Sequence, residues 1–370
     1  MKILLIFGTR PEAIKMAPIV RELERKDVDF NVCVTAQHRE MLDQVLDFFS
    51  IQPDIDLNLM VPNQDLNTLS AQIFKEFGAV LEREQPNLVM VQGDTTTAFC
   101  VAMAAFNAGI KVAHVEAGLR TFNLNAPFPE EGNRQLIARI ASYHFAPTAQ
   151  AKDNLLKEGI PAKDIFLTGN TSIDALQYAK ATLKSGYENK EILDLQKRID
   201  PGLNLILVTA HRRENLEHGL LELCKGLNHL GTRGDVQIFF PVHPNPRVKK
   251  VIFKNIDSTA NIVLLKPLNF PALMWLMQKS KFIISDSGGI QEEAPSFNKI
   301  VLVTREETER VEGVKNGFSI MVGTSAARIV EESERIINGS SSSPSGKNPY
   351  GNGRAAAKIV QVLLESFKIS

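Results

Sequence analysis

The sequence predicts an α/β protein built from two Rossmann-like domains, each with a parallel sheet. The chain has 370 residues, more than one hydrophobic core usually supports. Short, nearly continuous apolar segments alternate with amphipathic helical patterns, which is typical of parallel sheets covered on both faces. The alternation stops near Thr168–Ser172 and restarts with Leu203–Thr209, a segment as apolar as the first. These observations favour two domains of similar design.

The first domain is expected to span residues 1–169. Its predicted strands are Ile3–Phe7, Phe30–Thr35, Leu88–Gln92, Lys111–Val115, His144–Pro147 and Ile165–Thr168. Its predicted helices are Pro11–Arg25, Glu40–Phe49, Leu69–Glu84, Thr96–Ala108 and Glu130–Ala141. Glycine follows several of these elements, as at Gly8, Gly93 and Gly109, which indicates where turns occur.

The second domain is expected to span residues 170–354. It begins with a long polar helical region, Ser172–Ile199, which Asp200-Pro201-Gly202 ends. Its predicted strands are Leu203–Thr209, Val236–Pro241, Ile262–Leu265, Phe282–Ser285 and Ile300–Val303. Asn338–Gly353 is rich in Gly, Ser, Pro and Asn and is predicted to be a loop. The last helix, over residues 355–370, could pack on either domain.

Composition and charge argue against several functional classes. Lys+Arg and Asp+Glu both number 42, so the formal net charge is zero, and no basic run offers a nucleic-acid surface. No apolar run reaches membrane-spanning length, and the N-terminal apolar segment is too short for a signal peptide. The three cysteines lie in apolar segments without metal spacing, as buried thiols of a reducing compartment do. We therefore expect a cytoplasmic protein that binds neither nucleic acid nor membrane.

Residues suited to chemistry gather where the predicted strands end. In an open parallel sheet, ligands bind outside the carboxyl ends of the strands. The polar segments at those ends are Gly8–Lys15, Asp94–Thr97, Glu116–Arg120, His211–Glu214, His243 and Ser287–Glu293. Two domains that face each other with such edges would form a cleft, which suits a nucleotide sugar and can close by hinge motion.

The stretch Lys281–Ala294 is the first candidate for anion binding. A short apolar strand runs into Ser287, Gly288 and Gly289, and a helix follows. Such a junction offers backbone N–H groups and the positive end of a helix dipole, and glycines let a phosphate approach the backbone. Glu293, one turn into the helix, could accept hydrogen bonds from a ribose diol. We interpret the stretch as a cradle for a nucleoside diphosphate, with an ordinary strand–helix turn as the alternative.

The turn Gly8–Lys15 is a second candidate for ligand binding. It follows a strand and opens a helix, but it lacks the glycine spacing of a P-loop or of a dinucleotide fingerprint. Arg10 and Lys15 could contact phosphate or uracil groups, or they could be ordinary surface cations.

Three carboxylates fall at strand or loop ends of the first domain. Asp94 follows Leu88–Gln92, Glu116 follows Lys111–Val115, and Glu130 opens a helix. Each has a structural explanation of its own, with Asp94 as a helix N-cap and Glu130 as a partner of the helix dipole. Together in a cleft they would form a group suited to acid–base catalysis.

Histidines mark two strand ends of the second domain. His211, with Arg212 beside it, directly follows Leu203–Thr209, and a histidine next to arginines favours an anion site capable of proton transfer. His243 lies in the proline-rich turn 241–246 and could bind a ligand or be structural. No cluster of His, Cys, Asp or Glu has zinc spacing, so we expect no tightly bound metal.

The motifs occur in a fixed order along essentially the whole chain. They are G-D-T-T-T, H-V-E-A-G-L-R, F-P-E-E-x-N-R, H-R-R-E-N, S-D-S-G-G-I-Q-E-E-A-P and T-E-R. This set resembles that of the bacterial non-hydrolysing UDP-N-acetylglucosamine 2-epimerases. The resemblance implies a glycosyltransferase-B-like fold of two domains, and interconversion of UDP-GlcNAc and UDP-ManNAc for cell-surface polysaccharide. It also implies a homodimer and no nicotinamide or metal cofactor.

The resemblance further implies residue roles. In the family's chemistry a proton leaves sugar C2, UDP leaves C1, and a 2-acetamidoglucal remains bound until UDP adds back with protonation of the other face of C2. The catalytic residues carried over are Asp94, Glu116, Glu130 and His211. The UDP ligands carried over are Arg10, Lys15, Ser287, Gly288, Gly289, Glu293 and Arg310. Which acid serves which face of C2 stays open.

Many family members also bind a second UDP-GlcNAc as an activator. The candidate allosteric residues that match this region are Gln37, Glu131, Arg212 and His243. A Gln and an Arg that some members use there are replaced by Glu40 and by Asn63 or Gln64. An acidic Glu40 facing a diphosphate would be unfavourable, so the sequence leaves activation open. Val311 also replaces a proline of the usual T-E-R-P-E motif.

Several alternative functions are compatible with the same motifs. The chain could be a 2-epimerase of another UDP-2-acetamido sugar, a choice that pocket residues around Leu268–Leu273 would decide. It could be a glycosyltransferase of the same fold, although no acceptor site stands out. A hydrolysing epimerase or a non-catalytic nucleotide-sugar sensor would also use such a cleft.

Overall fold

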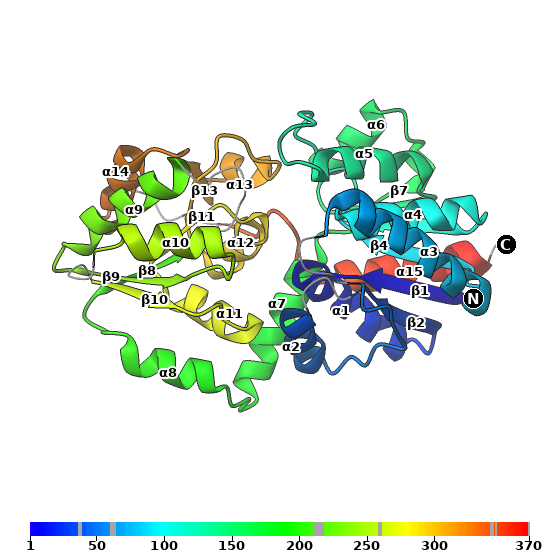
Figure 1. Cartoon of the computed structure of the whole chain (residues 1–370), viewed down its shortest axis with the longest axis horizontal. Coiled ribbons are helices and arrows are strands. Elements are labelled where there is room, and N and C mark those ends of the chain that lie inside the picture. The colour runs from blue at the N-terminus through cyan, green and yellow to red at the C-terminus, as the bar shows by residue number, and fades with distance from the viewer. Residues whose placement is uncertain are drawn as a thin grey trace. The chain divides into compact units, whose positions relative to one another are not determined.

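The computed structural model describes residues 1–35, 39–59, 64–210, 218–257, 261–340, 344 and 346–368. It divides into two compact units, Met1–Tyr178 with Tyr350–Ser370, and Ala179–Pro349. Each unit has its own parallel sheet with helices packed against it (Figure 1). The predicted α/β architecture with two parallel sheets is confirmed.

The sheet of the first unit has the strand order β3-β2-β1-β4-β5-β6-β7. Its strands are β1 (Lys2–Phe7), β2 (Asp29–Val34), β3 (Ile55–Asp56), β4 (Leu88–Gln92), β5 (Lys111–Val115), β6 (Tyr143–Ala146) and β7 (Ile165–Leu167). Its helices are α1 (Arg10–Arg25), α2 (Arg39–Phe49), α3 (Leu66–Glu84), α4 (Thr96–Asn107), α5 (Glu130–Ile140), α6 (Ala149–Lys157), the first part of α7 (Thr171–Lys184), and α15 (Ala355–Lys368). Because the order reverses between β1 and β4, the turns after these strands lie at the topological switch point, where such sheets bind ligands.

The second unit repeats this topology with the order β10-β9-β8-β11-β12-β13. Its strands are β8 (Asn204–Thr209), β9 (Val236–Pro241), β10 (Ile262–Leu265), β11 (Phe282–Ser285), β12 (Val301–Val303) and β13 (Ser319–Met321). Its helices are α8 (Lys190–Arg198), α9 (His218–Gly231), α10 (Pro246–Asn255), α11 (Phe270–Lys279), α12 (Gly288–Glu293), α13 (Val311–Lys315) and α14 (Ala326–Ile337). The switch point here lies between β8 and β11.

The central strands are apolar throughout because both faces of each sheet are covered. In β1 the residues Ile3–Phe7 are at most 1% exposed, and in β11 Phe282–Ile284 are fully buried. At roughly 25 cal/mol per Å² of apolar surface, such strands contribute most of the driving force for folding. They also hold the turns at their carboxyl ends on a rigid support.

The helical region expected at Ser172–Ile199 consists of two helices. The chain leaves α7 at Lys184 and enters α8 at Lys190. Gly186 between them has φ +89°, a left-handed conformation that only glycine adopts without cost. The Asn189 side chain then caps α8 by accepting a hydrogen bond from Ile192 N at 3.1 Å.

The last helix, α15, belongs to the first unit. It packs beside α1, and its N-terminus is capped by Asp174 of α7. The Asp174 carboxylate accepts hydrogen bonds from Ala355 N at 3.1 Å and Ala356 N at 3.0 Å. The division between the units falls within α7, after Tyr178, whereas the sequence pattern places it at residue 169.

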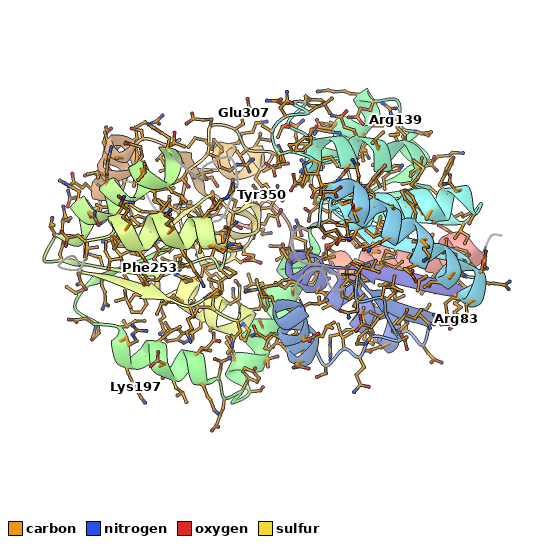
Figure 2. All side chains as sticks on the ribbon, viewed as in Figure 1. Arg83, Arg139, Lys197, Phe253, Glu307 and Tyr350 are labelled. Atoms are coloured by element: carbon orange, nitrogen blue, oxygen red, sulfur yellow. The ribbon has the colours of Figure 1, made fainter. Side chains whose placement is uncertain are left out.

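The surface is polar around these cores. Charged side chains such as Arg83, Arg139 and Lys197 are exposed, while Tyr350 is only 2% exposed (Figure 2). The Tyr350 carbonyl accepts a hydrogen bond from Asn170 N at 2.7 Å, which ties the returning chain to the first unit. None of the helices in the described segments combines the length and apolar character needed to cross a membrane.

Candidate active site

Glu12 fastens the turn after β1 to the turn after β4. Its Oε2 accepts hydrogen bonds from Gly8 N (3.1 Å), Thr9 N (2.8 Å) and Thr9 Oγ1 (2.7 Å). Its Oε1 accepts one from Thr95 Oγ1 at 2.7 Å. Glu12 is 2% exposed, and burial raises the pKa of its carboxyl above the usual value. Sequence reasoning missed Glu12, although Thr9-x-x-Glu12 has the spacing of a capping box.

Glu116 lies in the turn after β5, where its carboxylate is buried and its backbone is strained. Its backbone has φ +66°, a conformation that is uncommon for residues other than glycine and carries some strain. Its Oε2 forms an ion pair with Lys15 Nζ and accepts hydrogen bonds from Gln92 Nε2 at 3.1 Å and Asn170 Nδ2 at 3.4 Å. The structure thus places Lys15, expected as a UDP ligand, beside a candidate catalytic acid.

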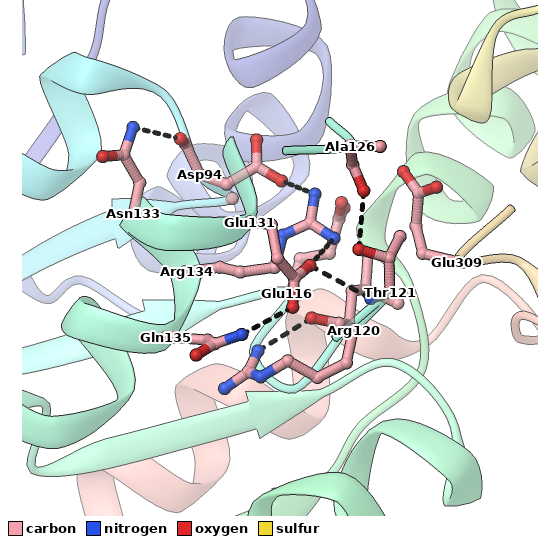
Figure 3. Close-up of polar contacts among 12 residues, drawn as sticks. Asp94, Glu116, Arg120, Thr121, Ala126, Glu131, Asn133, Arg134, Gln135 and Glu309 are labelled. Atoms are coloured by element: carbon pink, nitrogen blue, oxygen red, sulfur yellow. Dashed lines mark hydrogen bonds and ion pairs between the residues drawn. The ribbon is translucent and has the colours of Figure 1, made fainter. Parts of the chain in front are cut away.

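Asp94 lies in the turn after β4 and is held from α5. Arg134 forms an ion pair with Asp94 Oδ2, and Asn133 Nδ2 donates to the Asp94 backbone carbonyl at 2.9 Å (Figure 3). The N-cap of α4 is Thr95, whose hydroxyl accepts from Ala98 N at 3.0 Å. Asp94 therefore does not cap the helix, and its carboxylate is available for another role.

Glu130 and Glu131 open α5 in different environments. Glu130 is partly buried, whereas Glu131 is fully buried. Glu131 accepts hydrogen bonds from Thr121 N (3.0 Å), Phe122 N (3.1 Å) and Gln135 Nε2 (2.8 Å), and it pairs with Arg134 at 3.2 Å (Figure 3). These contacts give Glu131, expected at an activator site, a structural task in the loop between β5 and α5.

The turn after β11 has the predicted form of strand, glycine turn and helix. Thr209 Oγ1 and Ser285 Oγ are 2.7 Å apart across the switch point, and Ser285 Oγ accepts from Ser287 N at 2.9 Å. Gly288 lies directly against the Arg310 guanidinium, since a Cβ there would be 2.6 Å from Arg310 Cζ. At Gly289 the nearest atom to such a Cβ is 3.8 Å away, so this backbone is open. Glu293, the last residue of α12, is 7% exposed.

Arg310 is 6% exposed and is surrounded by carboxylates. Its Nε and Nη2 donate to Glu292 Oε1 at 2.9 and 2.8 Å, and its Nη1 pairs with Glu309 Oε1. Glu309 Oε2 also pairs with Arg305 at 3.0 Å. Sequence reasoning selected Arg310 but missed Glu292, Glu309 and Arg305 as its partners. A charged residue inside an otherwise buried helix, such as Glu292, is the signal that could have found them.

The remaining candidates are less closely grouped or lie outside the described residues. Arg10 is the first residue of α1 and is half-buried. His243 follows β9, and its Nδ1 accepts a hydrogen bond from Asn245 N at 3.2 Å, so the neutral ring carries its proton on Nε2. The candidates outside the described residues are Gln37, His211 and Arg212, and the same holds for Asn63 and for the side chain of Glu40.

Comparison with known proteins decides the family. The family model for UDP-N-acetylglucosamine 2-epimerase matches residues 21–364. The chain belongs to this family. A UDP-N-acetylglucosamine 2-epimerase of Campylobacter jejuni is 48% identical over 98% of this chain and 97% of its own length. One from Escherichia coli K12 is 46% identical and covers 98% of both chains. The resemblance inferred from the motifs is confirmed.

Solved structures agree with this assignment. A crystal structure of UDP-GlcNAc 2-epimerase from Neisseria meningitidis bound to UDP-GlcNAc has a TM-score of 0.95 and 44% identity, covering 99% of this chain and 100% of the other. The Methanocaldococcus jannaschii epimerase in complex with UDP-GlcNAc and UDP has a TM-score of 0.88 and 34% identity, with 99% and 100% coverage. A lipopolysaccharide outer core galactosyltransferase, 13% identical with a TM-score of 0.55 over 99% and 100% of the two chains, shares the fold. The glycosyltransferase-B-like fold is therefore confirmed.

Proposed function

We propose that this chain interconverts UDP-N-acetylglucosamine and UDP-N-acetylmannosamine by inverting sugar C2. The observation that carries the proposal is full-length identity of 46–48% to UDP-N-acetylglucosamine 2-epimerases. The paired acids of the first unit, Asp94 with Arg134 and Glu116 with Lys15, support it, because they are suited to proton transfer at carbon. The product would serve as a source of ManNAc-type sugars for cell-surface polysaccharide.

The proposed reaction is an elimination followed by a re-addition. One carboxylate among Asp94, Glu116 and Glu130 takes the C2 proton, and the electrons of that C–H bond form the C1=C2 bond of a 2-acetamidoglucal. The C1–O bond breaks at the same time, and its electron pair leaves with UDP, assisted by His211. UDP then adds back to C1 while a different group protonates the opposite face of C2. The sequence of steps is redox-neutral, so it consumes neither nicotinamide nor another electron acceptor.

The residues proposed to hold UDP lie at strand ends of both units. Ser287, Gly288 and Gly289 would accommodate the diphosphate, and the open backbone at Gly289 supports a close approach. Glu293 would bind the ribose hydroxyls, and Arg310 would attract the diphosphate. The remaining proposed ligands, from α1, are Arg10 and Lys15. Because Lys15 pairs with Glu116, a diphosphate near Lys15 would lie beside a catalytic acid.

An isotope-exchange assay tests the proposed reaction. Incubation with UDP-GlcNAc in D2O, with no nicotinamide added, should place deuterium at C2 of both UDP-GlcNAc and UDP-ManNAc. Absence of exchange at C2 would refute the proposal. Stoichiometric loss of the UDP-sugar would instead indicate a hydrolysing enzyme, and a panel of UDP-2-acetamido sugars would show which substrate is preferred.

Activation by substrate is tested in the same assay. UDP-ManNAc is supplied with and without a small amount of UDP-GlcNAc. Acceleration by UDP-GlcNAc would support an activator site that includes Gln37, Glu131, Arg212 and His243. An unchanged rate would match the acidic Glu40, which disfavours a second diphosphate.

We propose that the enzyme is a cytoplasmic homodimer. The outer surfaces of three neighbouring helices of the first unit carry large exposed apolar residues, Phe74 on α3, Phe106 on α4 and Leu136 on α5, which are 37%, 53% and 49% exposed. Such residues on adjacent helices favour contact with another protein surface. Analytical ultracentrifugation should give a dimer mass for the wild type, and Phe106→Asp should shift the equilibrium toward the monomer.

A further inference from the structure

Arg134 is a buried cation with no assigned part in the proposed chemistry. Its side chain is 4% exposed, on the face of α5 that also buries Ile137 and Ala138. An arginine in such a position is tolerated only when carboxylates compensate its charge. Its partners are Asp94, a candidate catalytic acid, and Glu131.

Asp94 is held by contacts from two consecutive residues of α5, Asn133 and Arg134. Arg134 pairs with Oδ2 of its side chain, and Asn133 holds its backbone carbonyl at 2.9 Å. In the described part of the chain, Asp94 Oδ1 receives no hydrogen bond. One oxygen is thus fixed, and the other is left for a proton. This arrangement suits a carboxylate that acts as a general acid or base.

Glu131 fixes Arg134 from the other side. It is fully buried, and the backbone N–H groups of Thr121 and Phe122 hold it in place. Because three other donors hold the Glu131 carboxylate, it stays in place and keeps the Arg134 guanidinium fixed. The planar guanidinium bridges the two carboxylates with separate nitrogens, Nη1 to Glu131 and Nη2 to Asp94, a geometry that a lysine ammonium does not reproduce.

We infer that Arg134 is a positioning residue that orients the Asp94 carboxylate for proton transfer at C2, with Glu131 as its rigid anchor. The inference rests on the proposed function and deepens it. Misplacement of a reacting group by about 1 Å can cost ~10²-fold in rate. Arg134 would therefore affect turnover although it does not touch the substrate.

Steady-state kinetics of Arg134→Met and Arg134→Lys test this role. For Arg134→Met we expect kcat to fall roughly 10²-fold while KM changes less than about threefold, because substrate binding is not altered. With substrate deuterated at C2 the isotope effect on kcat should increase, since proton transfer becomes slower relative to product release. Arg134→Lys should recover part of kcat because it restores a charge beside Asp94. If Arg134→Met does not fold, Arg134→Lys alone should still show a lower kcat and a larger isotope effect.

Arg21→Met is the control. Arg21 is a partly buried arginine of the same unit, whose Nη1 donates to the Phe49 carbonyl at 3.1 Å and whose guanidinium lies over the Tyr178 ring. Its loss should lower stability but leave kcat per folded molecule within about twofold of wild type. Equal losses of kcat in both methionine variants, or an Arg134 effect confined to KM, would overturn the inference.

A double-mutant cycle separates this inference from the proposed function. Asp94→Asn, Arg134→Met and the double variant are compared in urea unfolding, which needs no activity. Non-additive effects on stability are expected because the two side chains form one ion pair, and additive effects would overturn the pairing. If the wild type shows no exchange at C2 but the cycle is non-additive, the proposed reaction is refuted and the pairing of Arg134 with Asp94 stands.

Discussion

The turns at the carboxyl edges of the two sheets handle charge in different ways. In the first unit two of the candidate acids pair with different cations, Asp94 with Arg134 and Glu116 with Lys15. The pairs come from different elements, α5 and α1. One carboxylate can therefore gain or lose a proton without dismantling the partner of the other, as an enzyme that works on two faces of one carbon needs.

In the second unit the charges form one linked cluster, because Arg310 is shared by Glu292 and Glu309, and Glu309 also pairs with Arg305. The Arg310 guanidinium is packed beneath Gly288. Such a cluster is suited to a fixed cradle because moving one member disturbs all the others. This difference supports the proposal that proton transfer takes place on residues of the first unit and that residues of the second unit anchor the anion.

The largest expected effect comes from removing a charge in the first unit. Asp94→Asn should lower kcat by roughly 10²–10⁴-fold, the usual contribution of a positioned acid or base. UDP affinity, measured by calorimetry, should change less than about threefold. Asp65→Asn is the control, because Asp65 is an exposed N-cap of α3 and should lose only stability. Comparable losses of turnover and of UDP binding in Asp94→Asn would place Asp94 in binding instead.

The second largest effect should come from acid pH, which is expected to destabilise the sheet of the first unit more than that of the second. His114 and His144 are neighbours in β5 and β6 and are at most 1% exposed, whereas no strand of the second unit described here contains histidine. Burial lowers the pKa of His114 to about 3 and that of His144 to about 4. Between these values and about 6.5, the unfolded chain binds protons that the folded chain does not. The free energy of unfolding should therefore fall with decreasing pH, by up to about 1.4 kcal/mol per unit for each histidine.

Hydrogen exchange at pH 7.5 and 5.5 measures this difference by region. Protection of β5 and β6 should be lost at pH 5.5 before that of β8 and β11. His144→Gln should flatten the pH dependence, while His229→Asn, on the exposed surface of α9, should not change it. Equal loss of protection in both sheets would contradict the prediction.

Substitutions at Gly288 and Gly289 distinguish the effect of packing from the effect of ligand access in the second unit. Gly288→Ala should cost about 1–3 kcal/mol of stability through overpacking, because the guanidinium of Arg310 is held by Glu292 and Glu309 and cannot retreat. Gly289→Ala has space for its methyl group and should leave the melting temperature unchanged or slightly higher. Its UDP affinity should fall because the methyl would obstruct a phosphate. Equal melting temperatures for the two variants would contradict the packing argument.

The sequence predicts the architecture well because buried parallel strands consist of continuous runs of apolar residues. It misses β3 and β13, edge strands of two and three residues in which Asp56 and Ser319 interrupt the apolar run. It also misses the break at Gly186, since a single glycine within a polar helical pattern is tolerated in many helices.

Asp94 and Glu116 could be predicted because each follows an apolar strand, and Glu130 because it opens a helix. Their partners could not, because the partners come from distant segments. Asp94 and Arg134 are 40 positions apart, and Lys15 and Glu116 are 101 apart. Only the folded sheet brings such pairs together. An arginine on the buried face of a helix, such as Arg134, indicates that a carboxylate lies nearby, but the sequence does not show which carboxylate it is.

The smallest predicted effect concerns the junction that joins the C-terminal helix to the first unit. Asp174 caps α15 through two backbone N–H groups, and burial raises its pKa to about 6. Asp174→Ala should cost about 1 kcal/mol through loss of the cap. A raised carboxyl pKa means that the charged form is disfavoured in the folded state, so wild-type stability from this group declines as pH rises through 6. The variant should therefore lose more stability, relative to wild type, at pH 5 than at pH 8.

Urea unfolding at the two pH values measures this effect. Asp194→Ala is the control, because Asp194 lies on α8 of the second unit with 66% of its side chain exposed, and it should be nearly neutral at both pH values. A larger loss for Asp174→Ala at pH 8 would mean that the carboxylate stabilises α15 mainly through its charge. In that case Asp174 would stabilise the fold through its negative charge, as the paired carboxylates of Asp94 and Glu116 do, and not as a neutral buried cap.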